Sequence, residues 1–486
     1  MKSKTKELLF GILAIIGGVL IHFTFGHFYT IANMVPYIMG YIKARVQPDV
    51  RDELVIWLSA LALGVQGISM PLGGFLAKKI GFRIVVAISC LLESGSVLLT
   101  YVTIQKSFAG VMITYSLMKG AGLGFGYSVV LAVAGTWFPA RRGLVVGFIV
   151  GGFGLGALVF TPVQTAFINP DNVKVDNVTR QFTDNALLDR VPTVFLMLGG
   201  ILLGLQIIGF ILLRPKPKPS AEDEAREEEE AVSGVKSPNQ LLGNPDHQAD
   251  EPLEENLTPK QLLRRLDFYL LWFVMFCNII PITIITSAYK FFGQFYISDD
   301  LFLSAIATTS SVFNSGGRIV WGAFVDKVSF KIPLCVMLSM WAVILITFPH
   351  LSLTQDVTLK VLYAIWVCLL FFSLSGVFAI MPAATGRLFG AANLAVNYGL
   401  VFNAFAAGSI LCALITSFVR SKDAYLVQFT GCGCVCLLAL FTVFWIEDKR
   451  MPPRWNICRW CSTRCANWRG YQQPGSRAFE MDTKGH

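Results

Sequence analysis

Charged residues are scarce in this chain of 486 residues, because only 15% are Asp, Glu, Lys or Arg while 54% are hydrophobic. Soluble globular proteins carry about 25% charged residues. Long apolar runs recur along the whole chain, which excludes a soluble domain with a single membrane anchor. Because a helix that spans a bilayer needs about 20 mostly apolar residues, the composition predicts a protein that crosses the membrane many times.

Signatures of several other protein classes are also missing. The chain has no Walker phosphate-binding loop, which argues against an ATP-driven pump. Its apolar runs lack the two-residue alternation of strands, so helices are predicted rather than a barrel. Eight of the eleven cysteines lie in predicted spans, where Cys behaves as a small apolar residue, and no disulfide framework is visible. We therefore predict an all-α membrane protein with no metal and no cofactor.

Twelve apolar segments are predicted to span the membrane, six on each side of a polar interruption. They are residues 8–31, 54–77, 84–104, 108–134, 143–167, 191–213, 267–295, 303–325, 332–352, 359–385, 393–418 and 424–445. Residues 214–263 are acid-rich and poor in aromatics, which predicts a disordered cytoplasmic linker with a short amphipathic entry into span 7. The predicted organisation is an N-terminal half (1–213), this linker, a C-terminal half (264–446) and a cytoplasmic tail (447–486).

Basic residues outnumber acidic ones, with a formal net charge of +9. They lie mostly in short loops and in the tail, which indicates membrane topology rather than nucleic-acid binding. The loops that follow spans 2, 4 and 8 become cytoplasmic if both termini are cytoplasmic, and the basic bias toward them is present but modest. This topology places the sequon at Asn177 outside, as a glycosylation candidate. We expect the protein in the plasma membrane.

A short internal repeat marks the ends of spans 2 and 8. One copy runs over 74–83 and the other over 322–331, and both follow the pattern G-x-x-x-(charged)-K-x-x-x-(K/R). The copies lie at the equivalent loop of each half. Internal repeats with a central binding site are typical of secondary transporters.

These loops resemble the signature between helices 2 and 3 of the major facilitator superfamily, where it helps to latch the cytoplasmic side. The resemblance implies a cytoplasmic gate that includes Lys78, Asp326 and Lys327. The usual acidic residue of the signature is replaced by Lys78 in the first copy, whereas the second copy keeps Asp326. Asp326 is therefore expected to be the main residue of the predicted latch.

A narrower resemblance covers nearly all spans but not the linker or the tail. It rests on GGVLIHFTFGHFYT, GAGLGFGY, TWFPARRGLVVGFIVGGFGLGA, LTPKQLLRRLDFYLLW, FNSGGRIVWGAFVD and FGAANLAVNYGL. These segments are similar to the oxalate:formate antiporter group, which is close to the animal monocarboxylate transporters. The acid-Gly and Trp-rich signature that opens span 1 in the animal proteins is absent here, so the antiporter-like branch is favoured.

Four charged side chains lie inside the predicted spans and away from their very ends, and they are Glu93, Lys119, Lys290 and Arg318. Charges inside a bilayer are costly and usually mark function. Three positive charges against one negative charge favour an anionic cargo. This argument does not depend on any resemblance.

Arg318 in span 8 is the first candidate for holding a substrate carboxylate. Its guanidinium matches a carboxylate with two parallel hydrogen bonds and stays charged, and Asn314 shares its helix face four residues earlier. The resemblance agrees, since a span-8 arginine binds the substrate carboxylate in these families. The animal transporters have an aspartate linked to proton handling where this chain has Asn314, which weakens a simple proton symport. The alternative is that Arg318 extends to the cytoplasmic surface or belongs to the latch.

The other charged and titratable residues each have two interpretations. Lys119 and Glu93 either form a structural pair, which offsets the cost of burial, or serve transport through anion contact and proton binding respectively. His22, the deeper histidine of span 1, is a second proton-coupling candidate, and its alternative is helix packing. It lies about 140° around the helix from His27, so the two cannot share a face. Lys290 near the outer end of span 7 either contacts the anion or extends to the surface.

Polar residues of spans 4 and 11 complete the predicted substrate site. They are Tyr127, Tyr398 and Asn403, although membrane tyrosines also serve as interfacial anchors. The dicarboxylate antiporter of the resembling family has a lysine in span 11, and span 11 of this chain has none. One strong cation in the second half suits one carboxylate better than two, which favours pyruvate, lactate or formate.

Three cysteines of the tail lie among Arg and Trp just past span 12, and they are Cys458, Cys461 and Cys465. Cysteines next to a membrane span suit reversible palmitoylation. Unmodified thiols are the alternative, and a zinc site lacks a fourth ligand at good spacing.

The sequence thus predicts a secondary active transporter of a small organic anion, and not an enzyme. It would work by alternating access between the halves, in the lipid bilayer, with a coupled proton or in exchange for another anion. The alternatives are a transport-dead receptor or scaffold on the same fold, which Lys78 and the acidic linker make conceivable, and a carrier of a dicarboxylate or an unrelated solute.

Overall fold

The computed structural model describes residues 2–51, 54, 56–171, 173, 182, 184–216, 256–297, 300–418 and 424–448. Every regular element within these ranges is a helix, which confirms the predicted fold class. Several predicted features lie outside the described residues: Asn177, most of the linker (217–255), the tail beyond 448 with Cys458, Cys461 and Cys465, and the side chain of Lys290.

The first half of the chain forms a bundle of long helices, with short irregular helices inserted in its first and fourth spans. Its elements are α1 (Lys2–Phe25), η1 (Gly26–Thr30), α2 (Ile31–Arg45), α3 (Ile56–Ile80), α4 (Phe82–Thr103), α5 (Phe108–Val111), η3 (Met112–Met118), α6 (Lys119–Gly135), η4 (Pro139–Arg141), α7 (Arg142–Ile168) and α8 (Asn185–Leu212). The first span was predicted to end at residue 31, but the helical path continues through α2.

The second half repeats the pattern after a short entry helix. Its elements are α10 (Pro259–Leu262), α11 (Leu266–Tyr296), α12 (Asp300–Val328), α13 (Lys331–Thr347), η6 (Phe348–Leu353), α14 (Asp356–Phe389), α15 (Leu394–Phe402), α16 (Ala404–Phe418) and α17 (Ala424–Trp445). The entry helix α10 begins with a capping box, in which Thr258 and Gln261 satisfy free backbone groups at the helix start.

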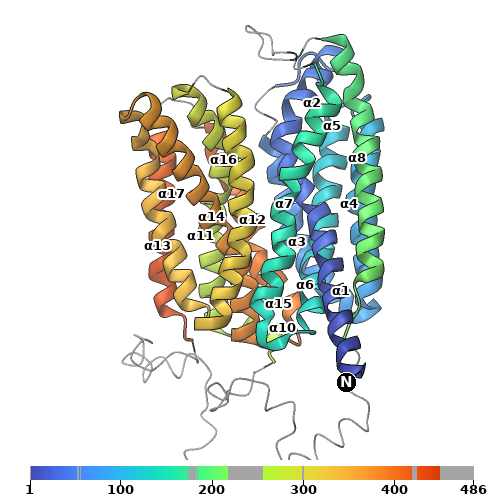
Figure 1. Cartoon of the computed structure of the whole chain (residues 1–486), viewed down its shortest axis with the longest axis vertical. Coiled ribbons are helices and arrows are strands. Elements are labelled where there is room, and N and C mark those ends of the chain that lie inside the picture. Colours follow the sequence, from blue (N-terminus) through green and yellow to red (C-terminus); the bar gives the residue numbers. More distant parts are fainter. Residues whose placement is uncertain are drawn as a thin grey trace, which may run out of the picture.

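The two halves stand side by side, with α1 to α8 on one side and most of α11 to α17 on the other (Figure 1). Eleven helices of the described residues are long and apolar enough to cross a membrane. The remaining long helix, α12, has 29 residues and packs against α7 and α14, so it completes a set of twelve. Its composition is more polar than that of the others because its middle has the sequence TTSSVFNSGGR.

The start of the chain and the entry to the second half lie at the same end of the bundle (Figure 1). The end of α17 is also there, since the backbone N–H of Glu447 donates to Asp267 in the first turn of α11. Lys331 at the start of α13 donates to the carbonyl of Ile446 at 2.8 Å. An even number of spans requires this arrangement, and we refer to this end as the N-terminal end.

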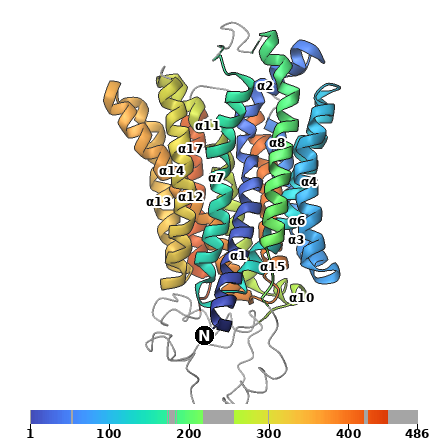
Figure 2. The same cartoon turned by 45° about the vertical axis from the view of Figure 1, so that its right-hand side comes forward.

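The closest contacts between the halves join α7 to α12 and α3 to both α15 and α16, and smaller contacts join α7 to α14 and α6 to α15. Figure 2 shows α7 beside α12 at the boundary of the halves. Glycine makes the closest approach possible, because a Cβ at Gly322 of α12 would lie 2.3 Å from the carbonyl oxygen of Gly143 on α7. A Cβ at Gly74 of α3 would lie 2.7 Å from the backbone nitrogen of Val396 on α15. Small residues of this kind let two helix backbones approach closely.

Candidate functional site

Arg318 lies in the boundary between the halves and is fully buried. Its guanidinium donates to the carbonyl oxygen of Val150 on α7 at 2.9 Å and to the hydroxyl of Tyr29 in η1 at 3.1 Å. Both of these partners belong to the first half, although Arg318 belongs to α12 of the second half. Its Nε donates to Asn314, four residues earlier on the same helix face, at 3.2 Å. Arg318 therefore bridges the halves.

The positive charge of Arg318 has no negative counterpart in the part of the chain that the structure describes. The ion pairs there join other residues, and its own hydrogen bonds go to neutral oxygens. The rings of Phe378 at 4.5 Å and Phe153 at 5.5 Å flank the guanidinium and offset part of its burial. An unbalanced cation in an apolar interior is a strong attractor for one anion.

Polar groups from three further elements gather around this cation. His22 of α1, Tyr127 of α6 and Tyr398 of α15 lie within electrostatic range of Arg318. The Nε2 of His22 and the hydroxyl of Tyr398 are buried and have no hydrogen-bond partner among the described residues. Buried polar atoms are nearly always paired, so such atoms beside a buried cation suit a ligand that accepts hydrogen bonds.

The sequence placed Asn403 in the same site, and the structure puts it at a second contact between the halves. Its amide donates to the carbonyl oxygen of Gly67 on α3 at 3.2 Å. This contact lies at the junction of α15 and α16 and ties the second half to the first. Asn403 and Arg318 thus join the halves through different helix pairs.

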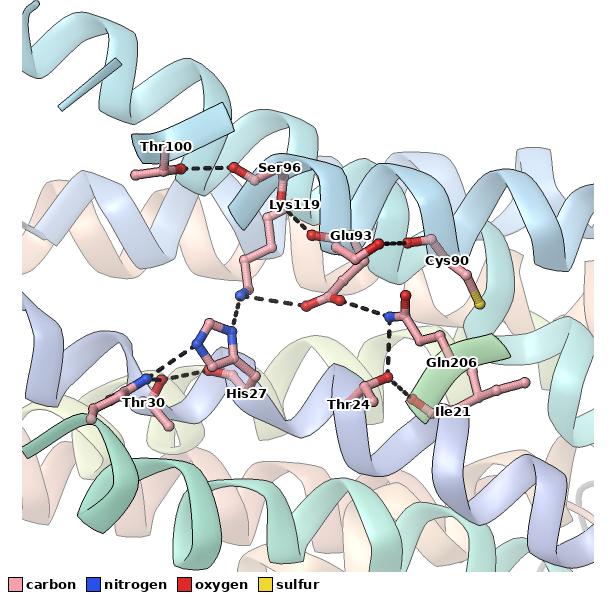
Figure 3. Close-up of polar contacts among 12 residues, drawn as sticks. Ile21, Thr24, His27, Thr30, Cys90, Glu93, Ser96, Thr100, Lys119 and Gln206 are labelled. Atoms are coloured by element: carbon pink, nitrogen blue, oxygen red, sulfur yellow. Dashed lines mark hydrogen bonds and ion pairs between the residues drawn. The ribbon is translucent and has the colours of Figure 1, made fainter. Parts of the chain in front are cut away.

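A separate polar network lies inside the first half (Figure 3). Lys119 at the start of α6 lies between the carboxylate of Glu93 on α4, at 3.5 Å, and Nδ1 of His27 in η1, at 2.5 Å. Gln206 of α8 donates to the other oxygen of Glu93 at 2.8 Å, and Gln164 of α7 contacts Nε2 of His27 at 3.1 Å. All five side chains are fully buried or nearly so. Five helical elements thus converge on one ion pair.

This network sharpens what the sequence left open for Lys119 and Glu93. The two do form an ion pair, as the cost of burying single charges favours. Sequence reasoning gave His27 no role with Lys119, although these two side chains make the closest contact of the network. His22 and His27 do face different surroundings, since His22 packs on Tyr127 and His27 on Tyr115.

Asp326 holds the halves together at the N-terminal end of the bundle. Its two carboxylate oxygens accept hydrogen bonds from the backbone N–H groups of Gly143, at 2.9 Å, and Leu144, at 2.7 Å, in the first turn of α7. The start of a helix carries free N–H groups and partial positive charge, so a carboxylate there is stabilising. Arg387 at the end of α14 adds an ion pair to Asp326 at 3.7 Å.

The other two predicted gate residues occupy different positions. Lys78 in the last turn of α3 and Lys327 beside Asp326 both lie at the surface of the bundle. By the repeat of the two halves, Lys78 corresponds to Asp326 and the start of α15 corresponds to the start of α7. A lysine cannot accept hydrogen bonds from a helix start, so the turn before α15 needs another partner.

The residues just before α10 supply that partner. Leu257 donates its backbone N–H to the carbonyl of Phe389 at 2.9 Å and accepts from the side-chain amide of Asn393 at 2.8 Å. The Asn256 side chain accepts from the backbone N–H of Ala392 at 3.0 Å. The end of the predicted linker thus supplies hydrogen-bond partners to the turn before α15. Nothing in the sequence pattern indicated this contact.

Replacing Asp326 with Asn is expected to lower the rate of substrate uptake several-fold, because the change removes the negative charge that faces the start of α7 and Arg387. Hydrogen bonds to a charged partner contribute about 1.5–3 kcal/mol, and the closed contact of the halves loses part of that. The control is Lys327→Gln, which alters the neighbouring surface residue. Uptake assays in vesicles with both variants check the prediction, and equal rates for the two would contradict it.

The chain matches the family model of the Major Facilitator Superfamily over residues 14–411. It is 26% identical to apicoplast pyruvate carrier 1 of Toxoplasma gondii, over 91% of this chain and 90% of that protein. It is also 26% identical to the oxalate:formate antiporter of Oxalobacter formigenes, over 81% of this chain and 85% of that protein. The solved structure of a xylose transporter from E. coli superposes with a TM-score of 0.62 at 15% identity, covering 91% of this chain and 99% of that one. The chain therefore belongs to the Major Facilitator Superfamily and is a membrane transporter, not an enzyme.

Proposed function

We propose that this transporter moves a small monocarboxylate, of the size of pyruvate, lactate or formate, by secondary active transport. The observation that carries the proposal is Arg318, a fully buried cation between the halves that pairs with no carboxylate of the described residues. A guanidinium binds a carboxylate with two parallel hydrogen bonds, which gives both strength and orientation.

The charge count of the boundary supports one carboxylate rather than two. Lys119 is already balanced by Glu93, so the described site offers one free positive charge, that of Arg318. A dicarboxylate would leave one negative charge without a partner in an apolar interior, which is costly. The name of one relative agrees with a monocarboxylate, since it is a pyruvate carrier, and the name of another covers formate as well as oxalate, which has two carboxylates.

The contacts of Arg318 also support alternating access. The anion would compete with Tyr29 and Val150 for the guanidinium, and these two groups belong to the opposite half. Binding would thus exchange a direct contact between the halves for one through the substrate. We assign Asn314, Tyr127, Tyr398 and His22, whose Nε2 has no hydrogen-bond partner among the described residues, to the walls of this site. The anion contacts predicted for Lys290 and Lys119 stay predictions.

The orientation in the membrane is also part of the proposal. We place both termini, the linker and the tail in the cytoplasm, with residues 1–213 and 264–446 as the moving halves and the plasma membrane as the location. The Asp326 contact would then close the cytoplasmic side. Protease treatment of sealed cells checks this placement, because only a cytoplasmic linker would be protected from protease outside.

The test of the proposed function is uptake of labelled substrates into vesicles that contain the purified chain. Pyruvate, lactate and formate should enter with saturable kinetics, and oxalate should compete poorly. Preferred uptake of oxalate would indicate a dicarboxylate carrier instead. The absence of saturable uptake for all four anions would favour the receptor or scaffold and overturn the proposal.

A further inference from the structure

The short 3-10 helix η1 (Gly26–Thr30) carries two side chains that contact two different buried sites. Tyr29 accepts a hydrogen bond from Arg318 at the boundary of the halves. His27, two residues earlier, contacts Lys119 inside the first half. We propose that Glu93, Lys119 and His27 form a proton-binding site separate from the anion site, and that η1 couples the two. This inference rests on the proposed function, because it assigns the coupled ion to the same transport cycle.

The network has the composition that a proton site requires. Glu93 is the one carboxylate that is fully buried within the membrane helices of the described residues. Its ion pair with Lys119 and the contact of Lys119 with His27 place three titratable groups in line. The neutral amides of Gln206 and Gln164 contact the two ends of the network, at Glu93 and His27 respectively. The charge of the network can therefore change while these amide contacts keep its side chains in place.

The groups that face Glu93 leave few other places for a proton. Cys90 lies on its own helix, Lys119 on α6, Tyr115 on η3 and His27 on η1, while α8 contributes the neutral Gln206. Thiols and phenols already carry their proton near neutral pH. A proton that enters the network therefore has a carboxylate and an imidazole to bind, and the carboxylate of Glu93 is the negative one.

Binding of a proton to Glu93 would form an O–H bond and end the ion pair with Lys119. The ammonium of Lys119, which donates to Nδ1 of His27, would keep its charge but would no longer be held from the side of Glu93. The contact that now fixes His27 would then be rearranged. Because His27 and Tyr29 lie on the same short helix, movement of one shifts the other. Release of Tyr29 would free an N–H of Arg318 for the carboxylate of the substrate.

The local backbone supports a moving part at this position. A 3-10 segment inside a longer helix often marks a hinge, and π-helical turns are frequent at functional sites. Both are present here, since η1 carries His27 and the π-helical segment η3 (Met112–Met118) directly precedes Lys119. A Cβ at Gly26 would lie 2.1 Å from the carbonyl oxygen of Phe153, so η1 rests directly on the backbone of α7.

The sign of the coupling follows from charge. A proton on Glu93 leaves one more positive charge in the buried interior, and an anion at Arg318 adds a negative one. Each therefore favours binding of the other, and this reciprocity is required by linkage. The anion and the proton would move together, although the acid expected beside the span-8 arginine is Asn314 in this chain.

The test measures protons taken up when pyruvate binds to the purified full chain in a weakly buffered solution. The native chain should take up about one proton for each pyruvate bound, since one carboxylate is neutralised. Glu93→Gln should still bind pyruvate but take up no proton. The control is Cys90→Ser, which changes a neighbouring side chain and should keep the proton uptake of the native chain.

Each outcome separates this inference from the proposed function. Pyruvate binding to the native chain without proton uptake would overturn the proton site and leave the carboxylate carrier intact, and so would native proton uptake by Glu93→Gln. No pyruvate binding to the native chain would instead overturn the proposed function. If Glu93→Gln fails to fold because Lys119 is left unbalanced, the double variant Glu93→Gln with Lys119→Gln removes both charges and should bind pyruvate without proton uptake.

Discussion

Replacing Arg318 with lysine is expected to lower the initial rate of pyruvate uptake by roughly 100-fold or more. Loss of one partner of a buried charged hydrogen-bonded pair costs about 2–5 kcal/mol, and each 1.4 kcal/mol is about a factor of ten. Lysine keeps the positive charge but not the planar fork, and its ammonium cannot reach Val150, Tyr29 and a carboxylate with the same geometry. Uptake of labelled pyruvate into vesicles measures the effect.

The matched control for this change is Lys331→Arg. Lys331 is also a nearly buried cation of the second half, but it donates to the carbonyls of Ile446 and Phe444 at the N-terminal end of the bundle. Replacing lysine with arginine at position 331 should leave the uptake rate close to that of the native chain. Equal losses for the two variants would show that any change at a buried cation disturbs the fold, and would remove Arg318 from the site.

Replacing Gly322 with leucine is expected to abolish most transport without unfolding the chain. Any side chain at this position meets the backbone of Gly143 on α7, with the first carbon atom only 2.3 Å from its carbonyl oxygen. Overpacking costs about 1–3 kcal/mol and occasionally more, and here backbone rather than a flexible side chain is in the way. Only the state in which α7 and α12 touch carries this cost, so the variant should accumulate with the halves apart at the N-terminal end.

The same helix offers a control, because Gly316 is exposed and a Cβ there would meet no atom within 4 Å. Gly316→Leu should transport at nearly the native rate. A cysteine placed at Ser315, which is buried against Gly151 of α7, reports on the separation of the helices. Its labelling by a water-soluble thiol reagent should rise with Gly322→Leu and not with Gly316→Leu. Unchanged labelling and uptake in Gly322→Leu would contradict the close approach.

The sequence predicted the broad architecture because its signals are strong and local. Apolar runs of about 20 residues mark the spans, and the acid-rich segment separates the two halves. Helical spacing alone placed Asn314 on the same helix face as Arg318, and the structure adds a hydrogen bond between them. The cost of a single buried charge made the ion pair of Glu93 with Lys119 one of the two interpretations of these residues, and the structure shows that pair.

The contacts that the sequence did not predict depend on backbone groups and on irregular helices. The carbonyl of Val150 and the N–H groups of Gly143 and Leu144 are groups that nearly every residue has, so nothing marks them before the fold is known. The contact of His27 with Lys119 depends on η1, because a 3-10 segment turns side chains by a different angle than an α-helix.

The most direct test of a carboxylate site between the halves is equilibrium binding of labelled pyruvate to the purified chain, which separates binding from movement. The native chain should bind one pyruvate in a saturable manner, and formate should displace it. Arg318→Lys should bind at least about tenfold more weakly, while Lys331→Arg should bind like the native chain. Pyruvate binding of native strength by Arg318→Lys would contradict the assignment of the anion site to Arg318.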